Sequence, residues 1–371
     1  MSDVAPVLGE NRAIARLGLE RIRVGPRPGL AALLAAARVQ AADVDLETIG
    51  FVLAPRLNAA GRVGEALDAA HLLLATTEDE ATELATRLEA ANGTRRDLMR
   101  EALAAARIAA GLATPDAPEP SFDHAAPQDL PAAIIVRGDW PVGIVGLVAG
   151  RLADETRRPA IVGTVLGDVV RASCRSDGRL DLAAALADCG HLLSRHGGHA
   201  AAAGFELPVG RWDEFVTVFQ AIAAAAGPAD PRRSVAIDVA LPAAFVDYPL
   251  LRDLARLGPC GVGNPEPVVA ALGLTVARVR EATGGHTQLV LRRERDVLDA
   301  IAFGRSDLAS TLREGDRIDV LARVASRAFG GIESIQLEVR DVSTSGSEAR
   351  AAQILARHAS RVAAVPAGAG A

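Results

Sequence analysis

The sequence contains no lysine, so all 40 of its basic residues are arginine. Acidic residues outnumber them at 46, and the formal net charge is −6, so no global basic field draws a polyanion to this protein. Any binding of phosphate must therefore be local, built from particular arginines and backbone amides. The absence of lysine beside so much alanine is most simply explained by a GC-rich genome.

Long apolar runs and cysteines are also scarce. Hydrophobic residues make up 50% of the chain, but no run of them reaches the roughly 18 residues of a membrane span. The first residues show no signal-peptide pattern, which predicts a cytoplasmic protein without a membrane partner. The three cysteines, Cys174, Cys189 and Cys260, are scattered and in no CxxC spacing, which argues against a disulfide framework or a zinc ribbon.

The first third of the chain is predicted to be helical. The 371 residues are enough for two or three domains. Thr77 and Glu80 form a capping box, and apolar residues then recur at three- and four-residue steps, which predicts one long helix over 77–112. A helical segment, 1–76, precedes this helix, and a proline-rich linker over 113–130 follows it.

Residues 131–229 are predicted to form an α/β domain with a mixed sheet. A short apolar strand, a helix and two more strands follow one another, and this order implies a βαβ unit with a parallel pair. Asp181 is expected to cap a helix over 182–196 that Gly197 ends in the left-handed conformation. A return strand is expected over 201–208.

Residues 230–342 are predicted to be all-β. Four apolar runs, TQLVLRR, VLDAIAFG, RIDVLARVAS and ESIQLEVRDV, are separated by turn signals, and about five such strands suit a small closed barrel such as an OB-fold. The alternation of Ile335, Leu337 and Val339 with polar residues predicts a half-buried strand. The tail, 343–371, is expected to be briefly helical and then disordered. The expected fold class is therefore multidomain α/β plus β-barrel, with a long connecting helix.

The stretch RHGGHAAAAG is the first candidate site. Gly197 and Gly198 follow the predicted helix, so they form either a C-cap, for which one glycine suffices, or a bare backbone that contacts a ligand together with His199. A metal site with His191 and His196 is disfavoured, because five residues place them about 140° apart around a helix and no carboxylate is spaced to join them.

Two further stretches combine arginines with neutral polar side chains. VRASCRSDGR is either an ordinary polar strand end or a phosphate site, since arginines and serine hydroxyls are the donors of charge-assisted hydrogen bonds to phosphate. Its candidate residues are Ser173, Arg175 and Ser176. APRLNAAGR offers Arg56, Asn58 and Arg62, either as ligand contacts or as groups that cap a helix. The GVG of LGPCGVGNPEP precedes a strand and is followed by two prolines, so a dinucleotide loop is improbable there.

In this order, the stretches resemble the RecJ family, bacterial single-strand-specific exonucleases of the DHH phosphoesterase superfamily. TIGFVLAPRLNAAGRVGEALDAAHLLL is similar to the segment that leads into the family's interdomain helix. DWPVGIVGLVAGRLADETRRPAIV, RASCRSDGRLDLAAAL and RHGGHAAAAGF are similar to its DHH-associated domain. LARLGPCGVGNPEPVV, HTQLVL and DAIAFG are similar to the entry of its OB-fold domain. The resemblance covers residues 1 to about 342.

The resemblance implies hydrolysis of single-stranded DNA from its 5′ end, in repair and recombination, with two Mn²⁺ or Mg²⁺ ions. It implies that Gly197, Gly198 and the catalytic His199 approach the scissile phosphate. Ser173 and Arg175 fall where the family holds the 5′-terminal phosphate, with Ser176 beside them. The resemblance also places three residues along the path of the strand, namely Arg56, Asn58 and Arg62. The barrel would hold the strand by stacking and electrostatics.

The chain departs from the family at two places. The family has an asparagine and a large aromatic residue near RVASRAFGG, where this chain has Ser326 and Phe329, so weaker binding by the barrel is expected. The DxD-type and Asp-His-His motifs of the catalytic core are absent, and Asp3 is left as an orphan metal ligand. Because one carboxylate cannot hold two metal ions, the chain alone is not expected to bind Mn²⁺ or Mg²⁺ stably or to catalyse.

The function expected is thus that of the C-terminal part of such an exonuclease, beginning inside the catalytic core. Its partners would be single-stranded DNA with a 5′ end and, in repair, a single-strand-binding protein or a helicase. One alternative is a non-catalytic binding subunit completed by a separate chain that carries the DHH motifs. Another is a small-nucleotide phosphodiesterase or editing module, which the barrel argues against because short substrates need no strand-holding domain.

Overall fold

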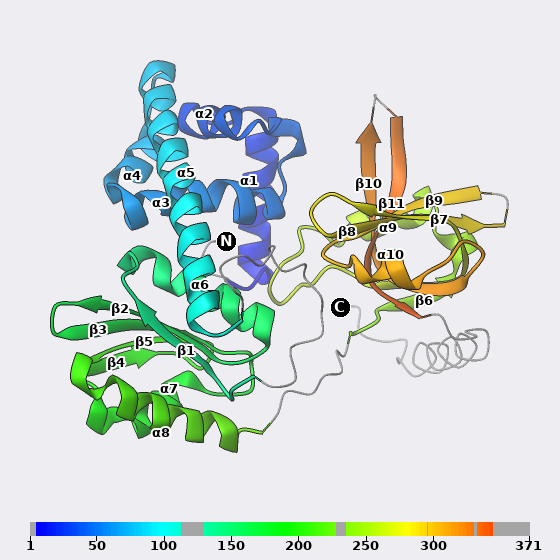
Figure 1. The fold of residues 1–371 in the computed structure, drawn as a ribbon. Coiled ribbons are helices and arrows are strands. Elements are labelled where there is room, and N and C mark those ends of the chain that lie inside the picture. Colours follow the sequence, from blue (N-terminus) through cyan, green and yellow to red (C-terminus); the bar gives the residue numbers. More distant parts are fainter. Residues whose placement is uncertain (1–4, 113–129, 228–234, 295, 330–331, 344–371) are drawn as a thin grey trace, which may run out of the picture. The chain divides into compact units, whose positions relative to one another are not determined.

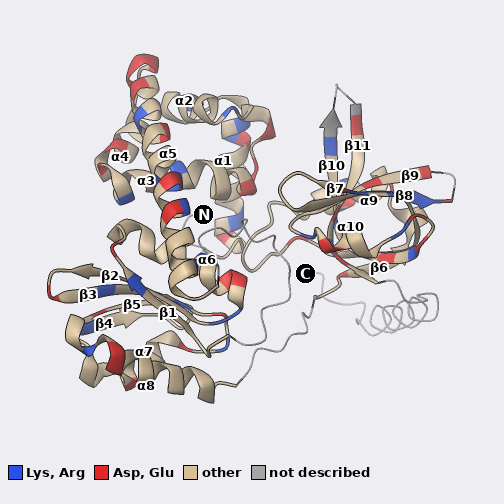
Figure 2. Cartoon of the chain, in the orientation of Figure 1, with Lys and Arg blue, Asp and Glu red and all other residues tan. Residues whose placement is uncertain are grey.

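The computed structural model describes residues 5–112, 130–227, 235–294, 296–329 and 332–343, which form two compact units (Figure 1). The first unit contains the described residues up to 227, and the second contains those from 235 onward. Asp3, nearly all of the expected linker and the tail beyond Ser343 lie outside the described residues. Basic and acidic side chains are interspersed over both units (Figure 2).

The first unit begins with helices that pack around one long helix, α5. They are α1 (Gly9–Val24), α2 (Pro28–Ala37), the short turns Ala41–Asp43 and Thr48–Leu53, α3 (Ala54–Val63), α4 (Ala66–Leu74) and α5 (Glu78–Ala109). The hydroxyl of Thr77 accepts a hydrogen bond from the Glu80 amide at 3.4 Å, as the capping box predicts. Ala81, Leu84 and Leu88 of α5 are buried against α2, α3 and α4, which is why the apolar spacing produces a helix here.

The second half of this unit is a mixed sheet with helices on both faces. Its elements are β1 (Ile134–Gly138), α6 (Val142–Thr156), β2 (Ala160–Leu166), β3 (Val169–Arg175), α7 (Leu182–Asp188), the turn Gly190–Leu192, β4 (Arg195–Gly198), β5 (Ala202–Pro208), the turn Val209–Arg211 and α8 (Trp212–Ala225). The strand order is β1-β2-β3-β5-β4; β1 and β2 are parallel and the other pairs antiparallel. The predicted βαβ unit and return strand are confirmed. Helix α6 covers one face together with α5, while α7 and α8 cover the other (Figure 1).

The helix expected over 182–196 is wrong in its second half. Asp181 does cap α7, accepting from the Ala184 amide at 3.1 Å, but α7 ends at Asp188. Arg195–Gly198 instead forms the edge strand β4, paired with β5. A helix continued over these residues would contain two adjacent glycines, a costly composition, whereas β5 offers partners for the backbone groups. Gly197 accordingly does not occupy a left-handed helix cap.

The second unit is a closed barrel. Its elements are β6 (Val239–Pro242), the turn Ala243–Phe245, α9 (Tyr248–Ala255), β7 (Val269–Ala282), β8 (His286–Arg293), β9 (Asp296–Ala302), α10 (Asp307–Thr311), β10 (Arg317–Phe329) and β11 (Ile332–Ser343). The sheet order β10-β11-β9-β8-β7-β6 is closed by pairing of β10 with β7, and β9 runs parallel to β11. Ile335, Leu337 and Val339 are buried as predicted. The expected barrel of about five strands is confirmed.

Candidate functional site

One face of the first unit's sheet carries a strip of bare backbone. Ser173 on β3 is in register with Gly204 on β5, and Gly204 is in register with Gly197 on β4. Residues directly opposite in a sheet project to the same face, so this row has one hydroxyl followed by two positions without side chains. Helix α6 covers β2 and β3 on this face, while β5 and β4 lie beyond it. A flat, glycine-floored surface therefore borders α6, and it is named the glycine floor below.

Two arginines share one carboxylate at one end of the glycine floor. Glu206 on β5 is in register with Arg171 on β3 and Arg195 on β4, and it accepts hydrogen bonds from both guanidinium groups. These hydrogen bonds, first from Arg195 and then from Arg171, hold the pKa of Glu206 below its ordinary value. The negative charge of Glu206 is thus committed to two arginines, and it makes no ion pair with Arg175, which lies at the other end of β3.

Arg175, at the end of β3, is half-buried and carries an uncompensated charge. It donates a hydrogen bond to the Cys174 carbonyl at 2.8 Å, and within the described part of the chain it makes no ion pair. Burial lowers its pKa, and the positive charge of Arg62 lowers it further. A half-buried guanidinium without a carboxylate costs solvation free energy that a bound anion would offset.

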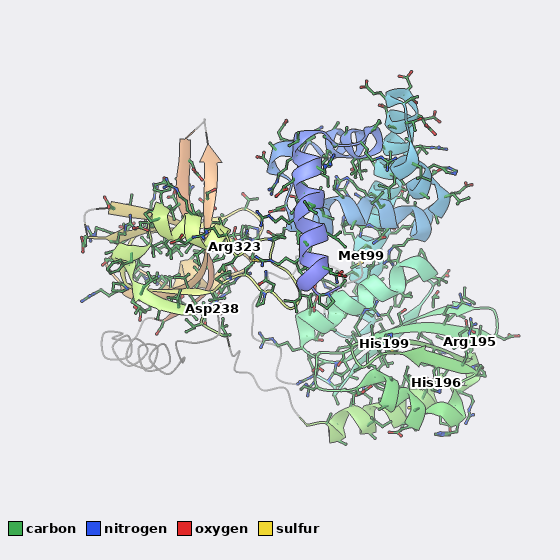
Figure 3. All side chains as sticks on the ribbon, turned by 180° about the vertical axis from the view of Figure 1, so that it is seen from behind. Met99, Arg195, His196, His199, Asp238 and Arg323 are labelled. Atoms are coloured by element: carbon green, nitrogen blue, oxygen red, sulfur yellow. The ribbon has the colours of Figure 1, made fainter. Side chains whose placement is uncertain are left out.

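A tight hairpin turn places Gly198 and His199 beside the end of β3. His199 and Ala202 exchange backbone hydrogen bonds of 2.9 and 3.3 Å, so by the alternation of an antiparallel ladder the Gly198 amide points away from β5, toward the open edge. The carbonyls of Ala200 and Ala201 accept from Leu182 and Ser176 amides at 3.1 and 3.0 Å, which fixes the turn. The His199 side chain is exposed, and it lies with Arg195 and His196 along this edge (Figure 3).

Gly198 is required by the geometry of this turn. Its φ is +143°, and a Cβ atom added there would lie 2.4 Å from the Cα of Ala203 and 2.6 Å from the Ala202 carbonyl oxygen. A Cβ on Gly197 would meet no atom within 4 Å. The two glycines are therefore present for different reasons. The backbone conformation of the turn requires glycine at position 198, whereas Gly197 leaves the surface above it open.

Ser176 is engaged within its own loop. Its hydroxyl donates to the Leu180 carbonyl at 2.6 Å and accepts from the Gly178 amide at 3.0 Å. These bonds close the turn after β3 and position the Ser176 amide, which donates to the Ala201 carbonyl. The role assigned to Ser176 as a phosphate contact stays a prediction.

The three residues of α3 lie in different surroundings. Arg56 has a side chain only 14% exposed; it pairs with Glu89 of α5 at 2.5 Å and donates to the Val52 carbonyl at 2.7 Å. Asn58 is exposed. Arg62 is exposed and donates to the Gly143 carbonyl at the start of α6 at 3.0 Å. The structure thus brings Arg62 to α6, and ties Arg56 to α5.

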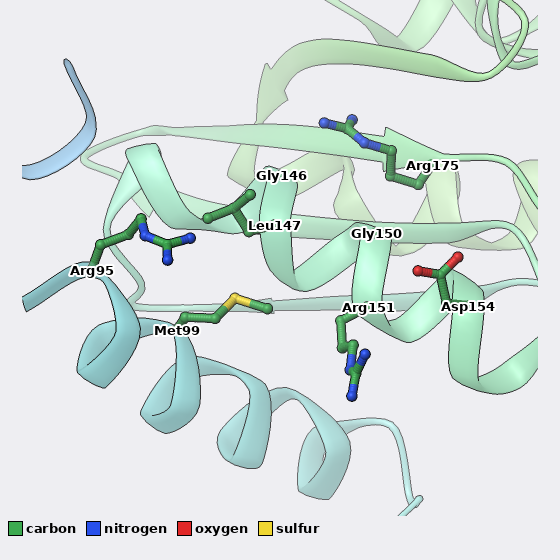
Figure 4. A pocket seen from close by; sticks show the side chains of 8 residues that line it. All are labelled: Arg95, Met99, Gly146, Leu147, Gly150, Arg151, Asp154 and Arg175. Atoms are coloured by element: carbon green, nitrogen blue, oxygen red, sulfur yellow. The ribbon is translucent and has the colours of Figure 1, made fainter. Parts of the chain in front are cut away.

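The structure also reveals a cavity that sequence reasoning missed. A cavity of about 330 Å³ lies between α5 and α6 and reaches β3 (Figure 4). Its lining residues are Arg95, Met99, Gly146, Leu147, Gly150, Arg151, Asp154 and Arg175. An added Cβ on Gly146 would lie 3.2 Å from an Arg175 nitrogen and 3.4 Å from the Ser173 hydroxyl, so this glycine gives Arg175 its room.

The cavity is electropositive. Burial lowers the pKa of Arg95, and the charges of Arg62, Arg96 and Arg56 lower it further. The Nε of Arg95 is buried and has no hydrogen-bond partner among the described residues. In the sequence, Arg95 is one of many charged residues on a long amphipathic helix, and only the packing of α5 against α6 distinguishes it. The sequence signal for this cavity is the pair Gly146 and Gly150, which lie four residues apart and therefore on the same face of α6.

Comparisons with known proteins decide the family. Residues 130–225 match the model of the DHHA1 domain, and residues 237–341 match that of the RecJ OB domain. RecJ from Thermus thermophilus is 31% identical over 92% of this chain, and RecJ from Bacillus subtilis is 29% identical over 93%. The chain belongs to the RecJ family.

The RecJ similarity extends to the three-dimensional structure. The crystal structure of T. thermophilus RecJ in complex with Mn²⁺ has a TM-score of 0.74 and 30% identity; the match covers 92% of this chain and 48% of that one. The same protein has been solved with Mg²⁺, with the same TM-score. The chain spans about half the length of the curated RecJ relatives it matches, 46% for T. thermophilus and 43% for B. subtilis.

The residues of this RecJ-family chain do not fit a two-metal centre by themselves. Among the described residues, no three His, Cys, Asp or Glu side chains come together as metal ligands, and Asp3 lies outside that part. Divalent ions of this kind require several oxygen or imidazole ligands. None of the described helices is long and apolar enough to cross a membrane.

Proposed function

We propose that this chain supplies the 5′-phosphate-binding and strand-binding parts of a RecJ-type exonuclease that degrades single-stranded DNA from the 5′ end during repair and recombination. The observation that carries the proposal is Arg175: a half-buried guanidinium without an ion pair in the described chain, next to Ser173, the glycine floor and the electropositive cavity. The matches to the DHHA1 and RecJ OB domains support it. We assign these roles to residues 131–229 and 230–342, with 1–76 and 77–112 as the end of a DHH domain and its connecting helix.

The proposed roles follow from chemistry at each position. Arg175 and the Ser173 hydroxyl would donate to the terminal phosphate, since a guanidinium presents a fork of N–H donors to phosphate oxygens. The glycine floor would let the next phosphodiester lie against the main chain, with the outward amide of Gly198 as a donor. His199, exposed at the turn, would contact the scissile phosphate, and Arg62, Asn58 and Arg56 would follow the strand.

The hydrolytic step needs groups that the described residues do not supply. In the family, two divalent ions activate water and stabilise the leaving oxygen. Because the described residues hold no fitting ligand set, we propose that this chain alone binds DNA without cleaving it, and that a DHH catalytic domain completes the site. Release of nucleotides by the purified chain with Mn²⁺ would contradict this proposal.

The remaining partners are further proposals. A single-strand-binding protein or a helicase would deliver the strand, and the protein would act in the cytoplasm. A separate DHH-bearing chain would complete the site if the two parts are encoded apart. A small-nucleotide phosphodiesterase is less well supported, because a short substrate needs no strand-holding barrel such as the second unit.

The test compares one DNA strand in two forms that differ only in the chemical group at the 5′ end. Fluorescence anisotropy would measure the affinity of the chain for a 3′-fluorescein dT oligomer with a 5′-phosphate and for the same oligomer with a 5′-hydroxyl. We expect the 5′-phosphate to bind at least tenfold more tightly, and Arg175→Ala to remove that preference, because hydrogen bonds to charged groups contribute about 1.5–3 kcal/mol.

Arg171→Ala is the matched control. Arg171 lies on the same face of the same strand, but Glu206 neutralises it, so its loss should leave the phosphate preference intact. Equal affinity of the unmodified chain for the two oligomers would refute the proposed role of the site.

A further inference from the structure

The cavity between α5 and α6 has the size of a small-molecule site. Its volume of about 330 Å³ lies at the lower end of the range of about 300–1,000 Å³ that such sites occupy. The proposed function fills only one end of it, because the terminal phosphate of a strand would bind at Arg175 while the rest of the strand follows the glycine floor onto β5 and β4. The space that α5 and α6 frame is then left without a ligand.

Two arginines border this space without a carboxylate of their own. Arg95 comes from α5 and Arg175 from β3, and neither makes an ion pair within the described part of the chain. The third arginine of the lining, Arg151, pairs with Glu155 at 3.0 Å, so its charge is already neutralised. Two guanidinium groups without carboxylates offer the donors that hold a phosphate.

The rest of the lining is apolar except for one carboxylate (Figure 4). Met99, one turn beyond Arg95 on α5, and Leu147 of α6 provide the apolar side chains. Asp154 lies one turn beyond Gly150 on α6; it is exposed and makes no ion pair within the described residues. Because a carboxylate repels phosphate and accepts hydrogen bonds, the Asp154 end suits a neutral group that carries N–H donors.

A nucleoside 5′-monophosphate carries matching groups. Its phosphate bears close to two negative charges at neutral pH, and its base has apolar faces and an edge with N–H donors. Guanine places N–H donors side by side at N1 and N2, and the two oxygens of one carboxylate can accept both. Thymine has a single N–H, so it would use the Asp154 carboxylate less well.

We propose that the cavity binds a free nucleoside 5′-monophosphate, with its phosphate held by Arg95 and Arg175 and its base toward Asp154. The inference rests on the proposed function, because Arg175 is shared: the mononucleotide that hydrolysis releases competes with the 5′-phosphate of the next strand. The terminal nucleotide of a strand is tied through its 3′ oxygen to the strand on the glycine floor, whereas a free nucleotide can turn its base into the cavity. Product therefore regulates the binding of new ends.

The experiment measures displacement of a 3′-fluorescein dT oligomer with a 5′-phosphate from the full chain, by anisotropy at constant ionic strength. We expect dGMP to act at an about tenfold lower concentration than inorganic phosphate, because the base adds apolar contact and hydrogen bonds. dTMP should lie between them, and deoxyguanosine should not displace the strand. Calorimetric titration of the chain with dGMP and with phosphate, without DNA, makes the same comparison directly.

Two variants test where the base lies. Asp154→Asn should bring dGMP to the level of dTMP, and Met99→Ala should weaken both nucleotides while competition by inorganic phosphate stays within twofold. Asp97→Asn is the matched control, because Asp97 is an exposed aspartate of α5 that does not line the cavity.

The nucleotide site is overturned if inorganic phosphate competes as well as dGMP, if Asp154→Asn leaves the advantage of dGMP intact, or if Asp97→Asn removes it. Its failure can be told apart from failure of the phosphate site. A chain that prefers 5′-phosphate over 5′-hydroxyl oligomers but does not distinguish dGMP from phosphate would lose only the nucleotide site. A chain without that preference would lose the proposed function, and the calorimetric comparison would then decide the cavity by itself.

Discussion

At the scale of single residues, the site contains a charge and a position without a side chain that the stability of the fold does not explain. Glu206 accepts hydrogen bonds from Arg171 and Arg195 on the same sheet face, whereas Arg175 donates only to a backbone carbonyl within the described residues. A Cβ atom added to Gly197 would meet no other atom within 4 Å, so a larger residue would fit there and would shield the sheet edge at β4. Such residues are candidates for function because stability alone would select others.

The two adjacent glycines provide a residue-scale prediction. Gly198→Ala should lower the free energy of unfolding by about 1–3 kcal/mol, because its φ of +143° and the 2.4 Å approach to Ala203 leave no space for a Cβ. Gly197→Ala should leave stability within about 0.5 kcal/mol but weaken binding of single-stranded DNA, since a methyl group would rise from the floor. Urea denaturation and anisotropy titration would measure the two effects. An equal loss of stability in both variants would contradict the distinction.

At the scale of elements, the cavity exists only because α5 and α6 are held in one arrangement. Glu155 of α6 pairs with Arg107 of α5 at 2.7 Å and with Arg151 of its own helix at 3.0 Å. The side chains of Arg107 and Glu155 are 13% and 15% exposed, so they form a partly buried cross-helix clamp. The helices that frame Arg95 and Arg175 are therefore fixed at the end opposite Arg62.

Breaking this clamp should affect both stability and site geometry. Glu155→Gln should cost about 1–3 kcal/mol of unfolding free energy, because two arginines would lose their shared carboxylate in a partly buried place. Glu20→Gln, which removes the exposed Arg16–Glu20 pair of α1, should cost less than about 0.5 kcal/mol. Chemical denaturation at low and at high salt would compare them. A cost at Glu155 no larger than that at Glu20 would show that the clamp does not hold α5 to α6.

The elements also show how far sequence reasoning carries. The long helix, the βαβ unit and the barrel follow from local periodicity, which is why they are predicted correctly. The strand at Arg195–Gly198 is missed because its hydrogen-bond partner, β5, follows it in sequence and decides its conformation only through tertiary pairing. β7 is indicated only as the strand that follows LGPCGVGNPEP, because its small apolar residues and Gly273 interrupt the alternation of its first half. Ser173 and Arg175 could be proposed from residue type, but Arg95 could not, because its burial is created by α6.

At the scale of the whole molecule, a net charge of −6 must coexist with the proposed binding of a polyanion. The association of a negative protein with DNA is not steered by its overall field, so the few local arginines carry the electrostatic part of binding. Binding should therefore depend on salt only moderately.

This expectation can be measured as a slope. If three or four phosphates are contacted, log K for a single-stranded oligomer should fall with log salt concentration at a slope of about −2 to −3, at roughly 0.7 per phosphate. Anisotropy titrations between about 50 and 300 mM salt would give the value, and Arg175→Ala should reduce its magnitude by about one contact. A slope steeper than about −6 would indicate an extended basic surface instead of a local site.

The open edge at β4 has a consequence for self-association. A sheet edge with outward-pointing amides can pair with a strand from another molecule, which is a common route to aggregation. The proposed function requires this edge to stay uncovered, so a helix or loop cannot shield it. Protection must come from the strand itself: β4 is only four residues long, two of them glycine, and Arg195 places a charge at its start. The features that make the edge accessible to a nucleic acid are thus also those that make it a poor template for another protein chain.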